Sequence, residues 1–336
     1  MKKKFLQLKT NKAFGPFMAL LGILLLNLIV MPDFFRIEIK NGHLFGSIID
    51  ILNRAAPLVI VSLGMTLVIA TEGIDISVGA VVAITGAISA TLISDMPVTM
   101  ALILSIMVGI ICGIWNGALV AHIGIQPMIG TLILMTVGRG IAQLITNGQI
   151  ITINNQAYSF IGTGYLLGLP FSIFIVLGVA LILWILVRKT ALGLFIESVG
   201  TNSLSSTYAG INSKKILFSV YVACGICAAI AGIIVCSNVK SADANNAGLW
   251  LELDAILATV IGGTSMRGGR FYIGGTIIGA FFIQSLTTTI YSLGVPPETI
   301  LVVKSMVVIL VSLSQSEKFK NDLRAMGKRR IASNEK

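Results

Sequence analysis

Residues 71–79 hold a group of polar side chains between two apolar stretches of the chain. Glu72 and Asp75 lie three residues apart among glycines, and Ser77 is placed to cap the helix expected to follow. One interpretation is a capped turn at a membrane surface. The other is the junction of a broken helix near a translocation path, and the residues favour the two interpretations equally.

Further polar groups lie on the apolar segments themselves. Arg139 is deep in one segment, where a charge is costly and is expected to face the bundle interior or pair with a carboxylate. Lys304 lies nearer a segment end and is expected to snorkel or to form a structural pair. Neutral side chains such as Asn116 suit hydrogen bonds to a sugar or, equally, to a neighbouring helix. The candidates for the path are Glu72, Asp75, Asn116, Arg139 and Gln143.

No group of residues forms a recognisable catalytic or metal site. His43 and His122 are far apart in the sequence. Cys224 and Cys227 have redox spacing, but their apolar setting is typical of buried helix residues. The glycine-dense residues 262–270 lack the G-x-x-x-x-G-K-[ST] pattern of a nucleotide site, so a tight turn between helices is expected there. We therefore predict that the chain is not an enzyme and holds no metal or cofactor.

Residues 188–215 form a polar island that is bracketed by pairs of basic residues. Residues 201–203 offer N-cap side chains, and Gly210 suits a left-handed helix end. This pattern predicts a helix of about two turns between 203 and 209, which needs a surface to lie on. One helical face would carry Leu204, Tyr208 and Ile211. The helix is either an ordinary interfacial helix or a coupling helix that enters a cleft of a soluble motor domain.

The composition is that of an integral membrane protein. Hydrophobic residues make up 55% of the 336 residues, charged residues only 11%, and the mean hydropathy is +0.94. Apolar stretches of about 16–25 residues match membrane-spanning helices and not the alternating strands of a β-barrel. The net charge of +10 gathers at the two ends of the chain, beside membrane spans, so nucleic acid is not expected as a partner.

Ten apolar segments predict an all-α, polytopic membrane fold with about ten transmembrane helices. The segments lie near residues 17–31, 55–70, 77–94, 98–121, 128–146, 170–187, 216–237, 255–265, 272–293 and 299–314. The second and the eighth are short. Either is expected to be broken or re-entrant, which membranes tolerate only where the segment is buried in protein or lines a cavity.

The distribution of Lys and Arg predicts the topology. With ten crossings, most basic residues fall on one side, which the positive-inside rule makes cytoplasmic, and both termini lie there. The main outer connections are then 32–54, 147–169 and 238–254. We expect one permease domain over residues 1–336. Its cytoplasmic parts are a basic N-terminus at 1–16, a coupling loop at 188–215 and a charged tail at 317–336.

Small residues at four-residue spacing predict tightly packed helices. The groups are Gly109, Gly113 and Gly117; Gly275 and Gly279; and Ala228 and Gly232. The spacing does not distinguish contacts within one subunit from contacts between subunits.

Four groups of residues resemble the permease subunits of bacterial sugar ABC importers of the ribose, xylose and galactoside type. They are 197–202 (E-S-V-G-T-N) with 209–212 (A-G-I-N); 72–79 (E-G-I-D-I-S-V-G); 126–132 (Q-P-M-I-G-T-L) with 139–140 (R-G); and 261–269 (I-G-G-T-S-M-R-G-G). They follow the family order over most of the chain. Relatives commonly carry alanines at Ser205 and Ser206, so the island helix has a weaker propensity here.

Within that family, residues 44–57 and 242–256 resemble permeases of galactofuranose importers. The resemblance implies two permeases around a central path in the bacterial cytoplasmic (inner) membrane, with galactofuranose or a related pentose or hexose as substrate. It also implies a related but different second permease, an ABC ATPase on the cytoplasmic loops, and a periplasmic or lipid-anchored sugar-binding protein. ATPase closure would move the coupling helices and switch the cavity by alternating access. The candidate coupling residues are Glu197, Gly200, Asn202, Leu204, Tyr208, Gly210, Ile211 and Asn212.

Two other functions remain open from the residues. A stand-alone secondary sugar transporter would favour mid-membrane carboxylates and inverted halves, and neither is clear in the sequence. A membrane anchor or assembly subunit without a path of its own would not depend on residues 72–79 or 139–143.

Overall fold

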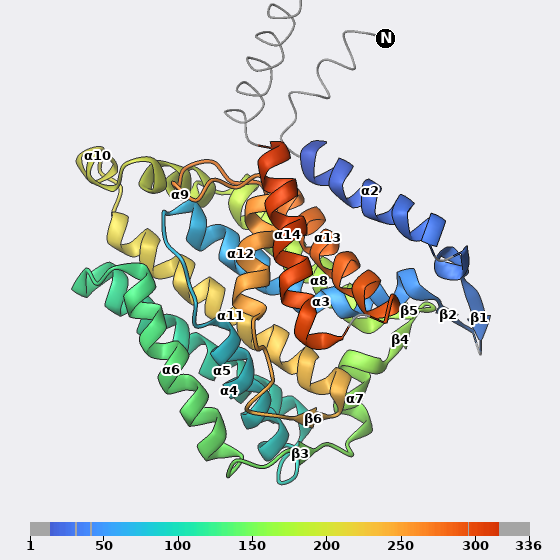
Figure 1. Ribbon diagram of the computed structural model, residues 1–336. Coiled ribbons are helices and arrows are strands. Elements are labelled where there is room, and N and C mark those ends of the chain that lie inside the picture. The colour runs from blue at the N-terminus through green and yellow to red at the C-terminus, as the bar shows by residue number, and fades with distance from the viewer. Residues whose placement is uncertain (1–13, 31, 41, 295, 316–336) are drawn as a thin grey trace, which may run out of the picture.

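The computed structural model in Figure 1 describes residues 14–30, 32–40, 42–294 and 296–315. The predicted basic N-terminus therefore lies outside the described residues except for 14–16, and the predicted tail at 317–336 lies wholly outside them.

Each of the ten predicted apolar segments overlaps a helix of the structure. They are α2 (Phe14–Val30), α3 (Ser47–Ala70), α4 (Val78–Leu92), α5 (Val98–Gly117), α6 (Pro127–Ile145), α8 (Phe171–Lys189), α11 (Ser213–Val239), α12 (Leu251–Ile261), α13 (Ile273–Ser292) and α14 (Pro297–Gln315). In the described part of the chain, six helices are long and apolar enough to cross a membrane: α3, α5 with the π-helical η2 (Ala118–Ile123), α6, α8, α11 and α13. A polytopic helical membrane protein is thus confirmed, whereas ten crossings and the side of the termini stay predictions.

The connections hold shorter elements. These are η1 (Pro32–Phe35), β1 (Glu38–Lys40), β2 (His43–Phe45), β3 (Ile151–Thr152), α7 (Gln156–Thr163), β4 (Tyr165–Leu166), β5 (Leu169–Pro170), α9 (Leu192–Thr201), α10 (Ser203–Tyr208) and β6 (Ser241–Ala242). The strands form three antiparallel pairs, β1 with β2, β3 with β6, and β4 with β5.

The short elements gather at two opposite ends of the bundle (Figure 1). The end with α9, α10 and residues 262–272 is called the α10 end, and the end with the strands and α7 is called the strand end. Connections distant in sequence meet at the strand end, where Ile151 pairs with Ala242 and the Leu44 nitrogen donates to the Gly168 carbonyl at 2.9 Å. The connections predicted for one side therefore do lie together.

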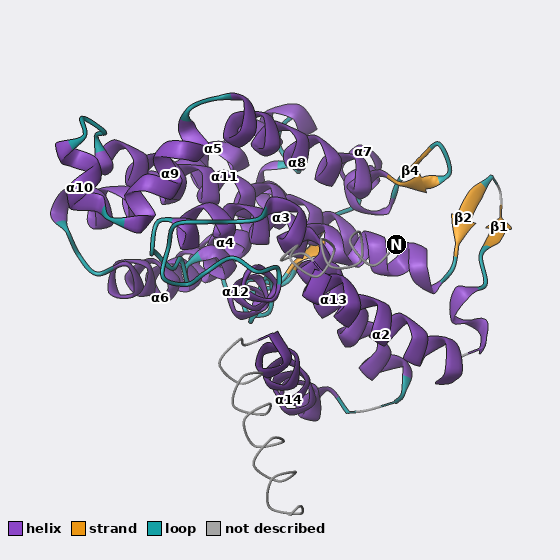
Figure 2. Cartoon of the chain, turned by 90° about the horizontal axis from the view of Figure 1, so that it is seen from above, coloured by secondary structure: helices purple, strands orange, loops and turns teal. Residues whose placement is uncertain are grey.

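Helix α3 is the centre of the bundle and is packed against α11, α13, α12 and α8 (Figure 2). All of its residues from 55 to 70 are buried. The prediction of a short, broken or re-entrant segment at 55–70 was wrong, because α3 is one continuous helix of 24 residues. The first turns of α3 carry polar side chains, so the apolar pattern of the sequence did not include them. Among them, Asn53 hydrogen-bonds Asn238 and Ser172 at the strand end.

The glycine patterns hold helices of this chain together. A Cβ atom on Gly113 of α5 would lie only 2.7 Å from the Tyr221 carbonyl oxygen of α11. One on Gly117 would lie 2.9 Å from the Phe218 ring. Gly279 of α13 fits against the Ala258 carbonyl of α12 in the same way. The small residues therefore act within the subunit, where they let backbones approach closely.

Candidate translocation site and coupling end

Two helices begin inside the bundle and meet at their N-terminal ends. Residues 71–77 lead inward from α3 to α4, and residues 243–250 lead inward from β6 to α12 (Figure 1). A Cβ atom on Gly79 would lie 2.5 Å from the Gly248 carbonyl oxygen and would overlap the Glu252 carboxylate. Glu252 is only 2% exposed, and its carboxyl group in the first turn of α12 lies beside the start of α4, so it is close to two positive helix ends. Such discontinuous helices frame substrate sites in many transporters.

A buried polar network fixes the first of these inward segments. The Asp75 carboxylate accepts hydrogen bonds from the Ser77 nitrogen at 3.0 Å and the Ser77 hydroxyl at 2.6 Å. The Asn116 amide donates to the Ser77 hydroxyl at 2.8 Å and to Asp75 at 3.3 Å. All three residues are buried. The capping role expected of Ser77 was wrong, because its hydroxyl turns back to Asp75 and makes no cap hydrogen bond.

The second inward segment is held by Arg139 and Gln143. The Arg139 guanidinium donates to the carbonyl of Ala247 at 2.6 Å and to that of Ala244 at 3.2 Å. The Gln143 amide donates to the Asn245 side-chain oxygen at 2.6 Å. Arg139 therefore binds backbone carbonyls instead of the directly paired carboxylate considered from the sequence, although the charge of Glu252 lies near it.

Asp243 shapes the start of the same segment. Its carboxylate accepts from the Asn246 side chain at 2.8 Å and from the Asn245 nitrogen at 2.9 Å. These hydrogen bonds, the one from Asn246 first, lower the pKa of the Asp243 carboxyl. Asp243 thus stays ionised at neutral pH and keeps the turn in one shape.

The predicted path residues form one buried group, one partly exposed group and one separate residue. Asp75 and Asn116 belong to the buried network, while Arg139 and Gln143 hold residues 243–250 and retain exposed atoms. Glu72 lies apart from both, exposed at the α10 end with a positive φ of 65°.

Helix α10 forms where the polar island predicts it. The Asn202 side chain accepts from the Ser205 nitrogen at 2.9 Å, which is the expected N-cap. At the other end, Ile211 donates to Ser206 and Gly210 to Thr207, both at 3.0 Å, and Gly210 has a φ of 86°. This pair of bonds is a Schellman motif.

One face of α10 points away from the chain. Leu204 is 66% exposed and Tyr208 is 84% exposed. Ile211 lies beyond the helix end and is packed against the core, so the exposed apolar face has two members instead of three. The other face is held by Ser213, whose hydroxyl donates to the Ser203 carbonyl at 2.9 Å. Asn212 caps the next helix by accepting from Lys215 at 3.0 Å.

Gly200 connects this end to the central helix. The Gly269 nitrogen donates to the Ala70 carbonyl at 2.9 Å, at the end of α3. Gly200 lies against both, and a Cβ atom there would overlap the Ala70 oxygen and lie 2.6 Å from the Gly269 nitrogen. A Cβ atom on Gly268 would overlap the Gly200 carbonyl oxygen and lie 3.1 Å from the Glu72 nitrogen. The 197–202, 72–79 and 261–269 motifs therefore meet at one point.

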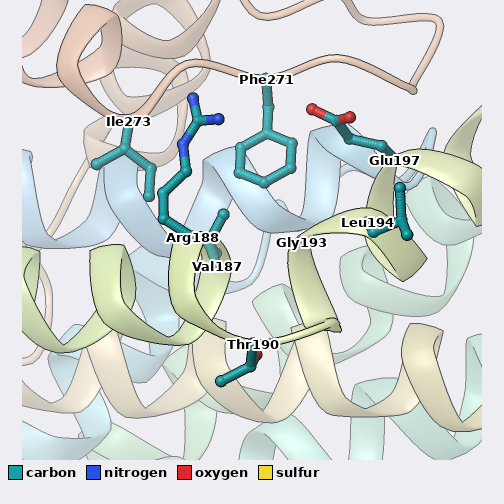
Figure 3. A pocket seen from close by; sticks show the side chains of 8 residues that line it. All are labelled: Val187, Arg188, Thr190, Gly193, Leu194, Glu197, Phe271 and Ile273. Carbon is teal, nitrogen blue, oxygen red and sulfur yellow. The ribbon is translucent and has the colours of Figure 1, made fainter.

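A pocket opens beside α9 at the α10 end (Figure 3). Glu197 and Arg188 approach the Phe271 ring from opposite sides of this pocket. The lining residues are Val187, Arg188, Thr190, Gly193, Leu194, Glu197, Phe271 and Ile273. Glu197, a predicted coupling residue, thus lies on the rim of a hollow between α8, α9 and the start of α13.

Comparison with known proteins identifies the family of this chain. The family described as "Branched-chain amino acid transport system / permease component" matches residues 47–312. The chain belongs to this family. It is 52% identical to the galactofuranose transporter permease protein YtfT of Escherichia coli K12, over 90% of this chain and 89% of the relative.

Other relatives of this permease are named as importers of other sugars. The fructose import permease protein FruF of Bifidobacterium longum is 41% identical over 84% of this chain and 81% of its own length. The ribose import permease protein RbsC of Bacillus subtilis is 36% identical over 90% and 92%. No solved structure matches this permease significantly.

The permease also has site features that the sequence did not single out. Glu252 and the contact between residues 243–250 and Arg139 were missed. A signal was present, because the eighth apolar segment is too short to span and follows the polar pair Asn245 and Asn246. A short segment of this kind marks a helix that begins inside the membrane.

Proposed function

We propose that this permease is one of two transmembrane subunits of an ATP-driven sugar importer in the bacterial cytoplasmic membrane. The proposed substrate is galactofuranose or a related pentose or hexose. The sugar transport functions of its relatives and the two inward segments support this function. Alternating access would expose the site formed around these segments first to one side and then to the other.

We assign the docking of the ATPase to the exposed face of α10. Leu204 and Tyr208 are a leucine and an aromatic side chain that the described residues of the chain leave exposed. A capped two-turn helix with such a face fits a helix-in-groove contact. This exposed pair is the single observation that carries the proposed coupling role.

The same end of the molecule provides the route by which ATPase closure would reach the path. Displacement of α10 moves α9, because both are joined through Asn202. The tight contact of Gly200 with Ala70 then passes the displacement to α3 without a flexible side chain between them. Since α3 is the centre of the bundle, its movement would reach the inward segment at 71–77.

A second, related permease would complete the path. Residues 243–250 form irregular backbone inside the bundle, yet Asn245, Asn246 and Trp250 are exposed in this chain. Irregular backbone is not tolerated against lipid. We therefore expect a partner permease and a water-filled path to cover this face, while a sugar-binding protein contacts the strand end.

The docking proposal is tested by copurification. Leu204→Ser combined with Tyr208→Ser is expected to reduce recovery of the ATPase with the affinity-tagged permease complex. Ile150→Ser is the matched control, because Ile150 is 62% exposed at the opposite end. Full ATPase recovery with the double variant would contradict docking on α10.

A further inference from the structure

Four exposed side chains lie on the inward segment 243–250 or on α6 beside it. They are Gln143, Asn245, Asn246 and Trp250, called here the amide surface. Three are carboxamides and the fourth is an indole. Gln143 comes from α6, and its hydrogen bond to Asn245 joins the two parts of the surface at 2.6 Å.

The backbone beneath this surface is fixed. Arg139 donates to carbonyl oxygens at both ends of the turn, those of Ala244 and Ala247. Asp243 accepts from the nitrogens of Asn245 and Asn246 at 2.9 and 3.2 Å. Such multiple hydrogen bonds hold the side chains that project from the turn, as a binding site requires.

Trp250 adds an observation of its own. It has a φ of 64°, a left-handed conformation that bulky residues rarely adopt, and its side chain remains 45% exposed. Strain of this kind persists only where surrounding contacts enforce it, and it gathers at functional sites. Here the enforcing contacts are those of Gly248 and Glu252, on either side of the start of α12, with Gly79.

The exposure of the amide surface excludes a lipid environment for it. Carboxamides and irregular backbone at membrane depth are costly against hydrocarbon. The outward residues of α6 such as Val137 and Ile141 are apolar, 53% and 38% exposed, and suit lipid or a partner helix. The amide surface therefore suits contact with water and not with lipid.

The chemistry of the surface suits a neutral polyhydroxylated ligand. Each carboxamide can donate and accept, as sugar hydroxyls do, and an indole offers an apolar face for the C–H groups of a sugar ring. Of the ionic groups nearby, Asp243 is hydrogen-bonded to the turn, Arg139 is hydrogen-bonded to carbonyls, and Glu252 is buried beneath the surface. An anionic or cationic substrate would find no free countercharge among these residues.

We propose that Gln143, Asn245, Asn246 and Trp250 contact the sugar during translocation and select neutral sugars. This inference rests on the proposed importer function. Arg139 is a positioning residue for this site, since it acts through the backbone of residues 243–250.

Sugar uptake by the reconstituted complex tests the inference. The complete complex in proteoliposomes would receive ATP and its binding protein loaded with labelled D-galactose, D-fructose or D-ribose. Asn246→Ala and Trp250→Ala are expected to lower the uptake rate about fivefold to tenfold, as for one lost hydrogen bond or ring contact. ATP hydrolysis stimulated by the loaded binding protein should persist, so fewer sugars enter per ATP. Asn246→Gln should change the ratio of rates among the sugars.

Asn154→Ala is the matched control. Asn154 is an exposed carboxamide on the strand end, and the pairing of β3 with β6 directs it away from Asn245. This variant should transport like the original protein. Unchanged uptake and unchanged sugar ratios in the Asn246 and Trp250 variants would overturn the inference. Absence of ATP-driven uptake in the original complex would instead contradict the proposed function.

A labelling experiment covers the case in which these variants fail to assemble. The four cysteines of the chain are buried, so the native protein provides a low background. Asn246→Cys should react with a charged, membrane-impermeant thiol reagent, and trapping the ATPase with vanadate should change the rate at least about threefold, because alternating access changes its exposure. Absence of labelling, or equal rates in both states, would place residue 246 outside the path and overturn the inference.

Discussion

Gly200 of α9 lies directly against Ala70, the last residue of α3. The carbonyl oxygen of Ala70 accepts a hydrogen bond from Gly269 at 2.9 Å, and a Cβ atom on residue 200 would overlap that oxygen. Two backbones and a glycine turn therefore meet without side chains between them. Because no flexible side chain can absorb the movement, such a contact passes a displacement of the α10 end on to the centre of the bundle.

The first prediction concerns this contact. Gly200→Ala should force α9 away from α3, since overpacking of a close backbone contact costs about 1–3 kcal/mol. We expect the complex to assemble and hydrolyse ATP but to take up sugar much more slowly. The measurement is the number of sugars imported per ATP in proteoliposomes.

Gly178→Ala provides the control for this variant. Gly178 lies in α8, and a Cβ atom there would meet nothing within 4 Å. This substitution should leave uptake unchanged. Equal coupling ratios for Gly200→Ala and the original protein would contradict a mechanical role for the contact.

The second prediction concerns the cap of α10. Asn202→Ala removes the acceptor for the Ser205 nitrogen and should destabilise this short helix by about 1 kcal/mol. ATPase binding should weaken, while insertion into the membrane stays normal. Asn202→Asp keeps a capping oxygen and should restore ATPase binding in the same copurification. If the Ala and Asp variants behave alike, the cap does not matter for docking.

The third prediction concerns Arg139. Arg139→Lys keeps the charge but cannot hold two separated carbonyls in the same way, and one unsatisfied carbonyl costs about 1–3 kcal/mol. We expect a lower unfolding temperature of the purified complex. Arg267→Lys, at an exposed turn, should leave that temperature unchanged. An Arg139→Lys protein of unaltered unfolding temperature would show that the guanidinium contacts add little.

The fourth prediction concerns the ion pair between α14 and α12. The Lys304 ammonium lies 2.9 Å from the Asp254 carboxylate and is only 8% exposed. Lys304→Met leaves the carboxylate unpaired and should destabilise the fold by about 3 kcal/mol. Adding Asp254→Leu should recover much of the loss, because a buried apolar pair needs no countercharge. Thermal unfolding of the single and double variants measures this, and an additive loss in the double variant would contradict it.

The sequence predicted the elements whose signals are local. The cap at Asn202 and the left-handed Gly210 defined α10 within one residue, and the apolar segments located every long helix. The structural pairing expected of Lys304 was also confirmed. These features depend on neighbouring residues, which the sequence lists in order.

Contacts between distant segments could not be predicted in this way. Asp50 and Asn53 were assigned to an outer connection because polar residues interrupt the apolar pattern, yet both lie on α3. The meeting of Gly79 with Gly248 and Glu252 joins residues about 170 positions apart, so no local pattern reveals it. The site is made of these long-range contacts, and it was therefore predicted less completely than the fold.

ATP-driven uptake of sugar tests the central claim most directly. The permease would be reconstituted with its ATPase, the second permease and the sugar-loaded binding protein, and labelled D-galactose inside the liposomes would be measured. We predict uptake only when ATP reaches the side of α10 and the binding protein is on the side of the strands. Uptake by this permease alone, driven by a proton or sodium gradient and unaffected by ATP, would contradict the account.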